Sequence, residues 1–216
     1  MKILALTDIH GAFDSVERIL EKEADSAAVI LGGDITTNGT VKHAMDAVKR
    51  FQRFGKPLFV VAGNMDQPET DAALEELGVG ISGRGLMLDQ VGVFGVSASP
   101  FTPLHTPYEI SEEEIALRAH AGWKDIQSAR TTIFVPHAPP ANTKVDALAN
   151  GSHVGSAAVR KFIEQHQPTV VVCGHIHEAR GIDRLGNSTI VNCGPAGKGY
   201  YAVITLGKEV HIEMKG

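Results

Sequence analysis

The stretch VVVCGHIHEARG, residues 170–181, joins a short apolar run to a glycine and two histidines one residue apart. The run over 169–173 has the length and the β-branched composition of a buried strand. Alternate residues of a strand share a face, so His175 and His177 point the same way if the extended geometry continues past Gly174. Neighbouring imidazoles that face a core need partners for their nitrogens, which makes this pair candidate metal ligands.

In the first half of the chain, short apolar runs alternate with amphipathic segments. Three runs predict strands, over 3–6, 27–31 and 58–62. The segments between and after them predict helices over 14–24, with Asp14 as its cap, 40–54 and about 69–77. This alternation is typical of βαβ units, and it predicts a mostly parallel sheet covered by helices.

The second half has a different pattern. Residues 86–97 predict a hairpin or a pair of strands broken at Gly92, and a proline-rich loop then leads to a helix that Ser111 and Glu114 begin as a capping box. Further strands are predicted over 132–135 and 169–173, with a helix over 156–166 between them. The tail, 180–214, reads as successive antiparallel strands. The two halves could therefore form two facing sheets.

Composition and charge narrow the classes of protein. A chain of 216 residues with 43% hydrophobic content predicts one domain over 1–216. The net charge of −5 and the lack of a basic stretch argue against a long nucleic acid as a partner. The opening MKILALT stops at Asp8, too soon for a signal peptide or a membrane span, so we expect a cytoplasmic protein with no membrane partner. Cys173 and Cys193 are expected to be reduced and mostly buried.

A metal-binding side chain follows nearly every apolar strand. The series is Asp8, His10, Asp34, Asn64, His137, His175 and His177. Strand ends in an open α/β sheet meet at one edge, so seven distant residues are predicted to come together there. Taken singly, each is more often a turn, cap or core residue, and the joint pattern carries the prediction. Glycines at 11, 32, 33, 63 and 174 would allow the backbone to approach an ion or substrate closely.

The ordered motifs D-x-H, G-G-D, G-N, H and G-H-x-H resemble those of the calcineurin-like metallophosphoesterase superfamily, especially its compact bacterial and archaeal phosphoesterases. The resemblance extends from Asp8 to the strand over 201–206. It implies an α/β fold, a four-layer αββα sandwich of two mixed sheets flanked by helices. It also implies ligand roles: Asp8, His10 and His177 for one metal, Asn64, His137 and His175 for a second, and Asp34 bridging the two.

The expected cofactors are two divalent metal ions, because a shared carboxylate reduces the repulsion between closely spaced ions. Imidazole, carboxylate and amide donors suit Mn²⁺ first, with Fe²⁺, Zn²⁺, Co²⁺ or Ni²⁺ as alternatives. The expected reaction is hydrolysis of a small phosphorylated substrate by a metal-bridging hydroxide, with Asp34 and Asn64 taking part in catalysis. A phosphodiester is favoured. The alternatives are a phosphomonoesterase and a non-catalytic metal-binding interaction module, and a homo-oligomer paired through a sheet edge stays open.

One position departs from the family pattern. Many members read G-N-H-D or G-N-H-E, whereas this chain reads GNMD, and Met65 has no proton to donate to a leaving group. We hypothesise that His105 or His153 replaces that acid, although a histidine in such a position is more often a solvated loop residue. Asp66 either orients a metal ligand or shapes a turn. Lys198, in the glycine-rich segment 194–199, could contact phosphate.

Overall fold

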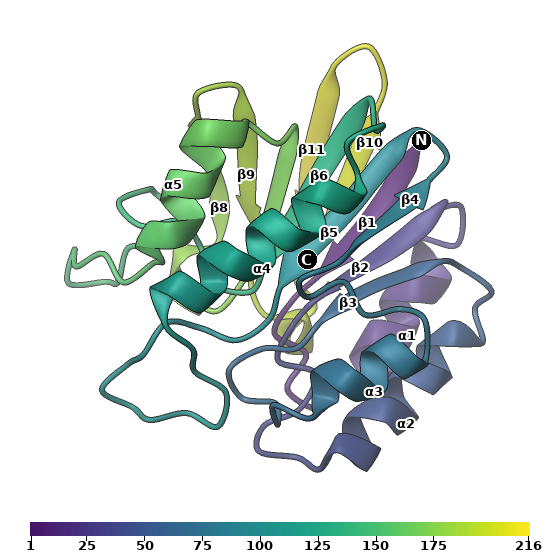
Figure 1. Ribbon diagram of the computed structural model, residues 1–216. Helices are drawn as coiled ribbons and strands as arrows, with labels where there is room; N and C mark the ends of the chain where they lie inside the picture. Colours follow the sequence, from purple (N-terminus) through teal and green to yellow (C-terminus); the bar gives the residue numbers. More distant parts are fainter.

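The computed structural model describes residues 1–216, whose strands form two sheets (Figure 1). The first sheet has the order β11-β10-β1-β2-β3. Its strands are β1 (Lys2–Leu6), β2 (Ala28–Gly32), β3 (Leu58–Val61), β10 (Tyr201–Leu206) and β11 (Val210–Lys215). The pairs β1–β2 and β2–β3 are parallel, while β10 is antiparallel to both β1 and β11. The last two strands of the chain therefore complete the sheet that the first three begin.

The second sheet has the order β4-β5-β6-β7-β9-β8. Its strands are β4 (Gly85–Leu88), β5 (Val91–Val96), β6 (Thr131–Pro136), β7 (Val170–Cys173), β8 (Gly181–Leu185) and β9 (Ser188–Asn192). The central strands β5, β6, β7 and β9 are parallel, and antiparallel β4 and β8 close the two edges. Both sheets are mixed.

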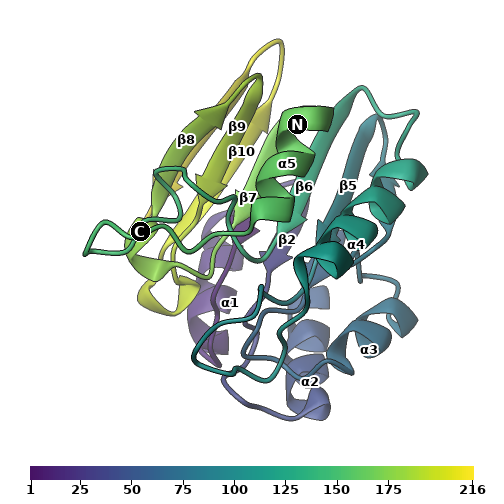
Figure 2. The same cartoon turned by 60° about the vertical axis from the view of Figure 1, so that its left-hand side comes forward.

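Helices cover the outer faces of the two sheets (Figures 1 and 2). They are α1 (Phe13–Lys22), α2 (Val41–Gln52), α3 (Thr70–Glu76), α4 (Glu112–Asp125) and α5 (Ala157–His166). The first three pack on the first sheet, and α4 and α5 pack on the second. This is the four-layer αββα sandwich that the resemblance implied.

Apolar side chains on both faces of each central strand fix the layers. In β1, Ile3 and Ala5 lie in the core between the sheets, whereas Leu4 and Leu6 lie under the helices. A strand buried on both faces needs an unbroken apolar run, which the sequence provides here. Cys173 and Cys193 obey the same alternation: both are buried and free, with Cys173 under the helices and Cys193 between the sheets, so no disulfide joins them.

Three local predictions have clear outcomes. The capping box at Ser111 is confirmed as an N-cap, because its hydroxyl accepts a hydrogen bond from the Glu114 N–H. The prediction that Asp14 caps the first helix is wrong: the helix begins at Phe13, and Asp14 lies in its first turn, where its carboxylate pairs with Arg50 at 2.8 Å. The break at Gly92 is also wrong, because the turn between β4 and β5 falls before Val91 and Gly92 pairs within the ladder.

The tail differs most from its prediction. It contains two antiparallel hairpins, β8–β9 and β10–β11, but they belong to different sheets, and β9 also pairs in parallel with β7. Local alternation does not tell which sheet a hairpin joins, because that choice depends on the distant strands β1 and β7. Strands β8 and β11 are sheet edges. Pairing of a second subunit on either edge stays a prediction. No helix is long and apolar enough to cross a bilayer.

Candidate metal centre

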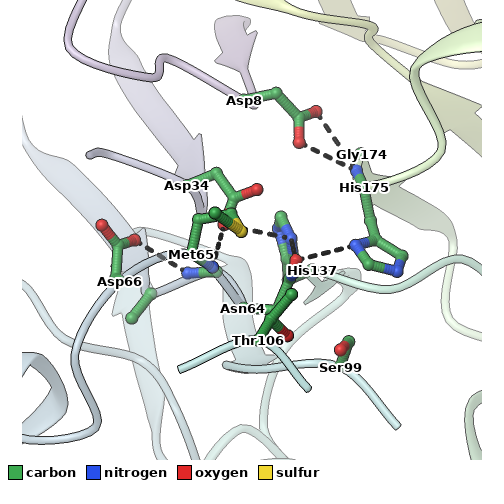
Figure 3. Close-up of polar contacts among 12 residues, drawn as sticks. Asp8, Asp34, Asn64, Met65, Asp66, Ser99, Thr106, His137, Gly174 and His175 are labelled. Atoms are coloured by element: carbon green, nitrogen blue, oxygen red, sulfur yellow. Dashed lines mark hydrogen bonds and ion pairs between the residues drawn. The ribbon is translucent and has the colours of Figure 1, made fainter. Parts of the chain in front are cut away.

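The seven predicted ligands lie in loops that follow strands β1, β2, β3, β6 and β7, all on the same edge of the sandwich. Figure 3 shows five of them, Asp8, Asp34, Asn64, His137 and His175, facing a common space. Four are almost completely buried, namely Asp8, Asp34, Asn64 and His137. The side chains of His10 and His177 are 26% and 40% exposed, so the centre opens to solvent on their side.

One group of donor atoms consists of Asp8, His10 and His177. The Nε2 atoms of His10 and His177 lie 3.3 Å apart, and His177 Nε2 lies 3.4 Å from Asp8 Oδ1. The Nδ1 atom of His10 is 2.8 Å from Thr37 Oγ1, a contact that turns the opposite nitrogen towards the centre. This group matches one of the two ligand sets that the resemblance implied.

A second group is built around Asn64. Its Oδ1 atom lies 2.9 Å from His137 Nε2 and 2.8 Å from His175 Nδ1. Asp34 lies between the groups: its Oδ2 is 3.5 Å from His10 Nε2 and its Oδ1 is 3.5 Å from His137 Nε2. A carboxylate with one oxygen beside each group is placed where a bridging ligand would be needed.

The donor atoms are arranged for cations rather than for one another. His137 Nδ1 donates its proton to the Gly32 carbonyl at 2.8 Å, which directs Nε2 towards the centre. Nε2 lies 2.9 Å from Asn64 Oδ1, which is itself 2.8 Å from His175 Nδ1. Ligands at about 2.1 Å from a transition metal place neighbouring donors roughly 3 Å apart, which fits these spacings. The residues therefore fit a site for two divalent ions.

The electrostatics of the two carboxylates differ. Burial alone would raise the pKa of Asp8, but His177 and His137 lower it to about 2. Burial raises the pKa of Asp34 to about 7, and the nearby carboxylates of Asp8 and Asp66 add to the effect although His137 opposes it. Burial, together with His137, lowers the pKa of His175 to about 3, so its ring is neutral and free to bind a metal. At neutral pH the centre holds one firmly ionised carboxylate and one that titrates.

Backbone strain accompanies the ligands. Asp8, His10, Asp34 and His175 have φ of 53°, 49°, 50° and 65°, in the left-handed region that few residues with a Cβ adopt. Such conformations persist only where the surroundings enforce them, and they gather at functional sites. Close approach adds a second constraint: a Cβ at Gly63 would overlap the Asp34 carboxylate. At Gly11 the φ of +80° favours glycine, and no protein atom would contact a Cβ there.

Comparison with known proteins places the chain among its relatives. A model of the calcineurin-like phosphoesterase family matches residues 1–179. The chain belongs to that family. Protein MJ1162 of Methanocaldococcus jannaschii is 32% identical over 217 residues, covering 99% of this chain and 96% of the relative.

Two solved structures share the fold of this chain. TT1561 of Thermus thermophilus superposes with a TM-score of 0.77 at 18% identity, covering 100% of this chain and 98% of that one. A novel archaeal phosphodiesterase superposes with a TM-score of 0.57 at 14% identity, covering 100% of both chains. At these identities the structures show the common fold.

His175 and His177 do not share a strand face, contrary to the extended geometry expected for them. Strand β7 ends at Cys173, His175 adopts a positive φ, and a 3₁₀ turn begins at His177. The two rings consequently face different groups of donors, as described above. The Asp8 carboxylate fixes this bend by accepting a hydrogen bond from the His175 N–H at 3.0 Å.

Met65 and Asp66 have distinct places in this protein. The Met65 N–H donates to Asp34 Oδ1 at 2.8 Å (Figure 3). This hydrogen bond holds the Asp34 carboxylate in place. Asp66 is completely buried, and it accepts hydrogen bonds at 2.8 to 3.0 Å from the main-chain N–H groups of Ile35, Thr36 and Gly63 and from the Thr36 hydroxyl. Asp66 therefore clamps the Asp34 loop to the Asn64 loop and touches neither group of donors.

The two histidines predicted as proton donors lie in surface loops. His105 is exposed, and its side chain makes no hydrogen bond or ion pair. His153 Nδ1 lies 2.7 Å from Oδ1 of the buried Asp146, and the ring is 40% exposed. No hydrogen bond links either side chain to the donor groups, so a catalytic role for His105 or His153 stays a prediction.

Thr37, which contacts His10, belongs to none of the predicted motifs. Three threonines stand close together after Asp34, and the structure gives each a different partner. Thr36 bonds to Asp66, Thr37 to His10, and Thr40 caps α2 by accepting from the His43 N–H. A polar residue between the Asp34 motif and a helix cap was the available signal, but the sequence could not tell which threonine faces the centre.

Proposed function

We propose that this protein is a metal-dependent hydrolase of small phosphodiesters. Asp8, His10 and His177 would hold one divalent ion, and Asn64, His137 and His175 would hold the other, with Asp34 shared. The observation that carries the proposal is the convergence of His137 Nε2 and His175 Nδ1 on Asn64 Oδ1, at 2.9 and 2.8 Å, inside a buried cluster beside Asp34. Such an arrangement is stable when a cation lies among the donors.

Two bound divalent ions, Mn²⁺ by preference, would act as Lewis acids that activate water and neutralise charge on the phosphate. The protein supplies two carboxylates, Asp8 and Asp34, against four positive charges, so the loaded centre keeps a positive charge that attracts an anionic substrate. Asp34 must give up the proton that its raised pKa retains near neutrality, so ion binding and deprotonation of Asp34 are coupled.

The surroundings of the centre favour a diester. A pocket of about 420 Å³ adjoins the centre, lined by Leu148, His175, His177 and Lys198 among others. It provides space for a second ester substituent, which a monoester does not have. Met65 stands beside Asp34 where a proton donor would be useful, and its thioether cannot supply one. We therefore expect either that the leaving group departs readily without a proton or that another residue donates a proton to it.

The test uses two substrates with the same leaving group. The protein is stripped of metal, reloaded with Mn²⁺, and assayed with bis(4-nitrophenyl) phosphate and 4-nitrophenyl phosphate. We expect metal-dependent turnover with the diester faster. Asp34→Asn should lose this turnover, and Asp46→Asn, which changes an exposed carboxylate on α2, should keep it.

Other outcomes would contradict the proposal in distinct ways. Faster hydrolysis of the monoester would identify a phosphomonoesterase. Stoichiometric binding of Mn²⁺, Fe²⁺, Zn²⁺, Co²⁺ and Ni²⁺ without turnover of either substrate would favour a non-catalytic metal-binding module.

A further inference from the structure

The connection between β9 and β10 places a lysine beside the candidate metal centre. It contains a 3₁₀ turn, Ala196–Lys198, that lies against α1. The Ala196 N–H donates to the Thr7 carbonyl at 2.9 Å, and the Ser15 hydroxyl donates to the Ala196 carbonyl at 3.2 Å. The main chain of Lys198 is therefore anchored to the end of β1 and to α1, while its side chain is exposed.

Lys198 borders two adjoining pockets. One is the pocket lined by His175 and His177. The other, of about 470 Å³, is lined by Arg18, Lys22 and Lys198 together with Ser15, Tyr201 and Gly216, and no aspartate or glutamate side chain lines it. A surface with three cations thus begins at the edge of the metal centre and extends along α1.

These three cations are not neutralised by neighbouring side chains. Arg18, Lys22 and Lys198 make no ion pair, whereas Arg50 on the same side of the molecule is paired with Asp14 and Glu17. Glu23, next to Lys22 in the chain, is buried and bound to Lys2, Lys215 and the Tyr201 hydroxyl. In a chain with a net charge of −5, three cations without an ion-pair partner form a local group that favours an anionic ligand.

We propose that Arg18, Lys22 and Lys198 bind a second phosphate group of the substrate while the first occupies the metal centre. The inference rests on the proposed function and narrows its substrate class to small phosphoesters that carry two phosphates, such as a nucleoside bisphosphate ester or a short dinucleotide. Lys198 borders both pockets and so lies between the two phosphates. Three cations match one additional phosphate better than a long polyanion, which needs a larger number of contacts.

The test compares two esters that differ only in a second phosphate. Thymidine 5′-(4-nitrophenyl phosphate) and its 3′-phosphorylated form have the same scissile bond and the same leaving group. With the Mn²⁺-loaded protein we expect kcat/KM to be at least about tenfold higher for the 3′-phosphorylated ester, the effect of one or two hydrogen bonds to a charged group. In the triple variant Arg18→Gln, Lys22→Gln, Lys198→Gln this preference should fall to near one.

Lys49→Gln is the matched control, because Lys49 is an exposed lysine on α2 that lines neither pocket, and it should keep the preference. A preference near one in the wild type, or a preference that survives in the triple variant, would overturn the inference. So would stronger inhibition by single-stranded oligonucleotides as their length increases, since that would identify nucleic acid as the ligand.

If neither ester is hydrolysed, the proposed function fails and a binding measurement decides the subsite. Titration of the metal-free protein with inorganic pyrophosphate, followed by calorimetry, should show binding that is lost in the triple variant and kept in Lys49→Gln. Pyrophosphate that does not bind, or that binds the triple variant equally well, would refute the subsite independently of catalysis.

Discussion

Asp34→Asn is expected to stabilise the metal-free protein at pH 8, although it removes a proposed metal ligand. The pKa of Asp34 is raised by burial from 3.8 to about 7. The protonated Asp34 makes its full contribution to the free energy of unfolding below pH 4, and this contribution is lost as the pH rises through 7. At about 1.36 kcal/mol per pKa unit, the ionised carboxylate lowers the free energy of unfolding by roughly 4 kcal/mol above pH 7, as an upper value.

An asparagine at position 34 avoids this loss because it is neutral at every pH. Its Oδ1 can still accept from the Met65 N–H, and its NH₂ group can face the lone pair of His10 Nε2, which lies 3.5 Å from the replaced oxygen. His175, whose pKa falls to about 3, acts with the opposite sign over the same pH range, but it is present in both proteins and cancels in the comparison.

The assay is urea unfolding in EDTA at pH 5 and pH 8, and again at pH 8 with excess Mn²⁺. The advantage of the variant in EDTA should grow between pH 5 and pH 8 and reach ~2 kcal/mol or more. With Mn²⁺ the advantage of the variant should shrink by about 2.7 kcal/mol for each ion that only the wild type binds at a hundredfold excess over its Kd. A variant that is less stable than the wild type in EDTA at pH 8 would refute the reasoning.

Three further substitutions test the surroundings of the centre. Asp66→Ala should lower the free energy of unfolding by ~3 kcal/mol or more, because three buried N–H groups lose their acceptor, and a loss under ~1 kcal/mol in urea would contradict the clamp. Thr37→Val should weaken Mn²⁺ binding by about tenfold in calorimetry by releasing His10, and an unchanged affinity would exclude that role. Met65→His should accelerate hydrolysis of diesters with poor alkoxide leaving groups by about tenfold or more and leave 4-nitrophenyl esters nearly unchanged, whereas an equal effect on both would exclude proton donation.

The order of helices and strands could be predicted because the central strands are buried on both faces and appear as apolar runs. The assignment of the tail to two sheets could not, because the β8–β9 and β10–β11 hairpins have similar local patterns. The hairpin β10–β11 joins the first sheet because β10 pairs with β1, more than a hundred residues away. The hairpin β8–β9 joins the second sheet because β9 pairs in parallel with β7. The two predicted helix caps also had different outcomes. The hydroxyl of Ser111 caps its helix, whereas the Asp14 carboxylate pairs with Arg50 of a neighbouring helix.

The candidate ligands could be predicted because each follows a strand, and strand ends converge. Their orientation could not. The bend that directs His175 and His177 to different groups needs a positive φ at His175, which a sequence pattern for a strand does not indicate. The partners that orient the ligands, the Gly32 carbonyl and the Thr37 hydroxyl, come from the end of β2 and the loop after it, and become identifiable only when the loops lie together.

The most direct test of the two-ion centre is anomalous diffraction from crystals of the Mn²⁺-loaded protein. The account predicts two anomalous peaks, one among Asp8, His10 and His177 and the other among Asn64, His137 and His175, with Asp34 in contact with both. A single peak, or two peaks that do not share Asp34, would contradict it.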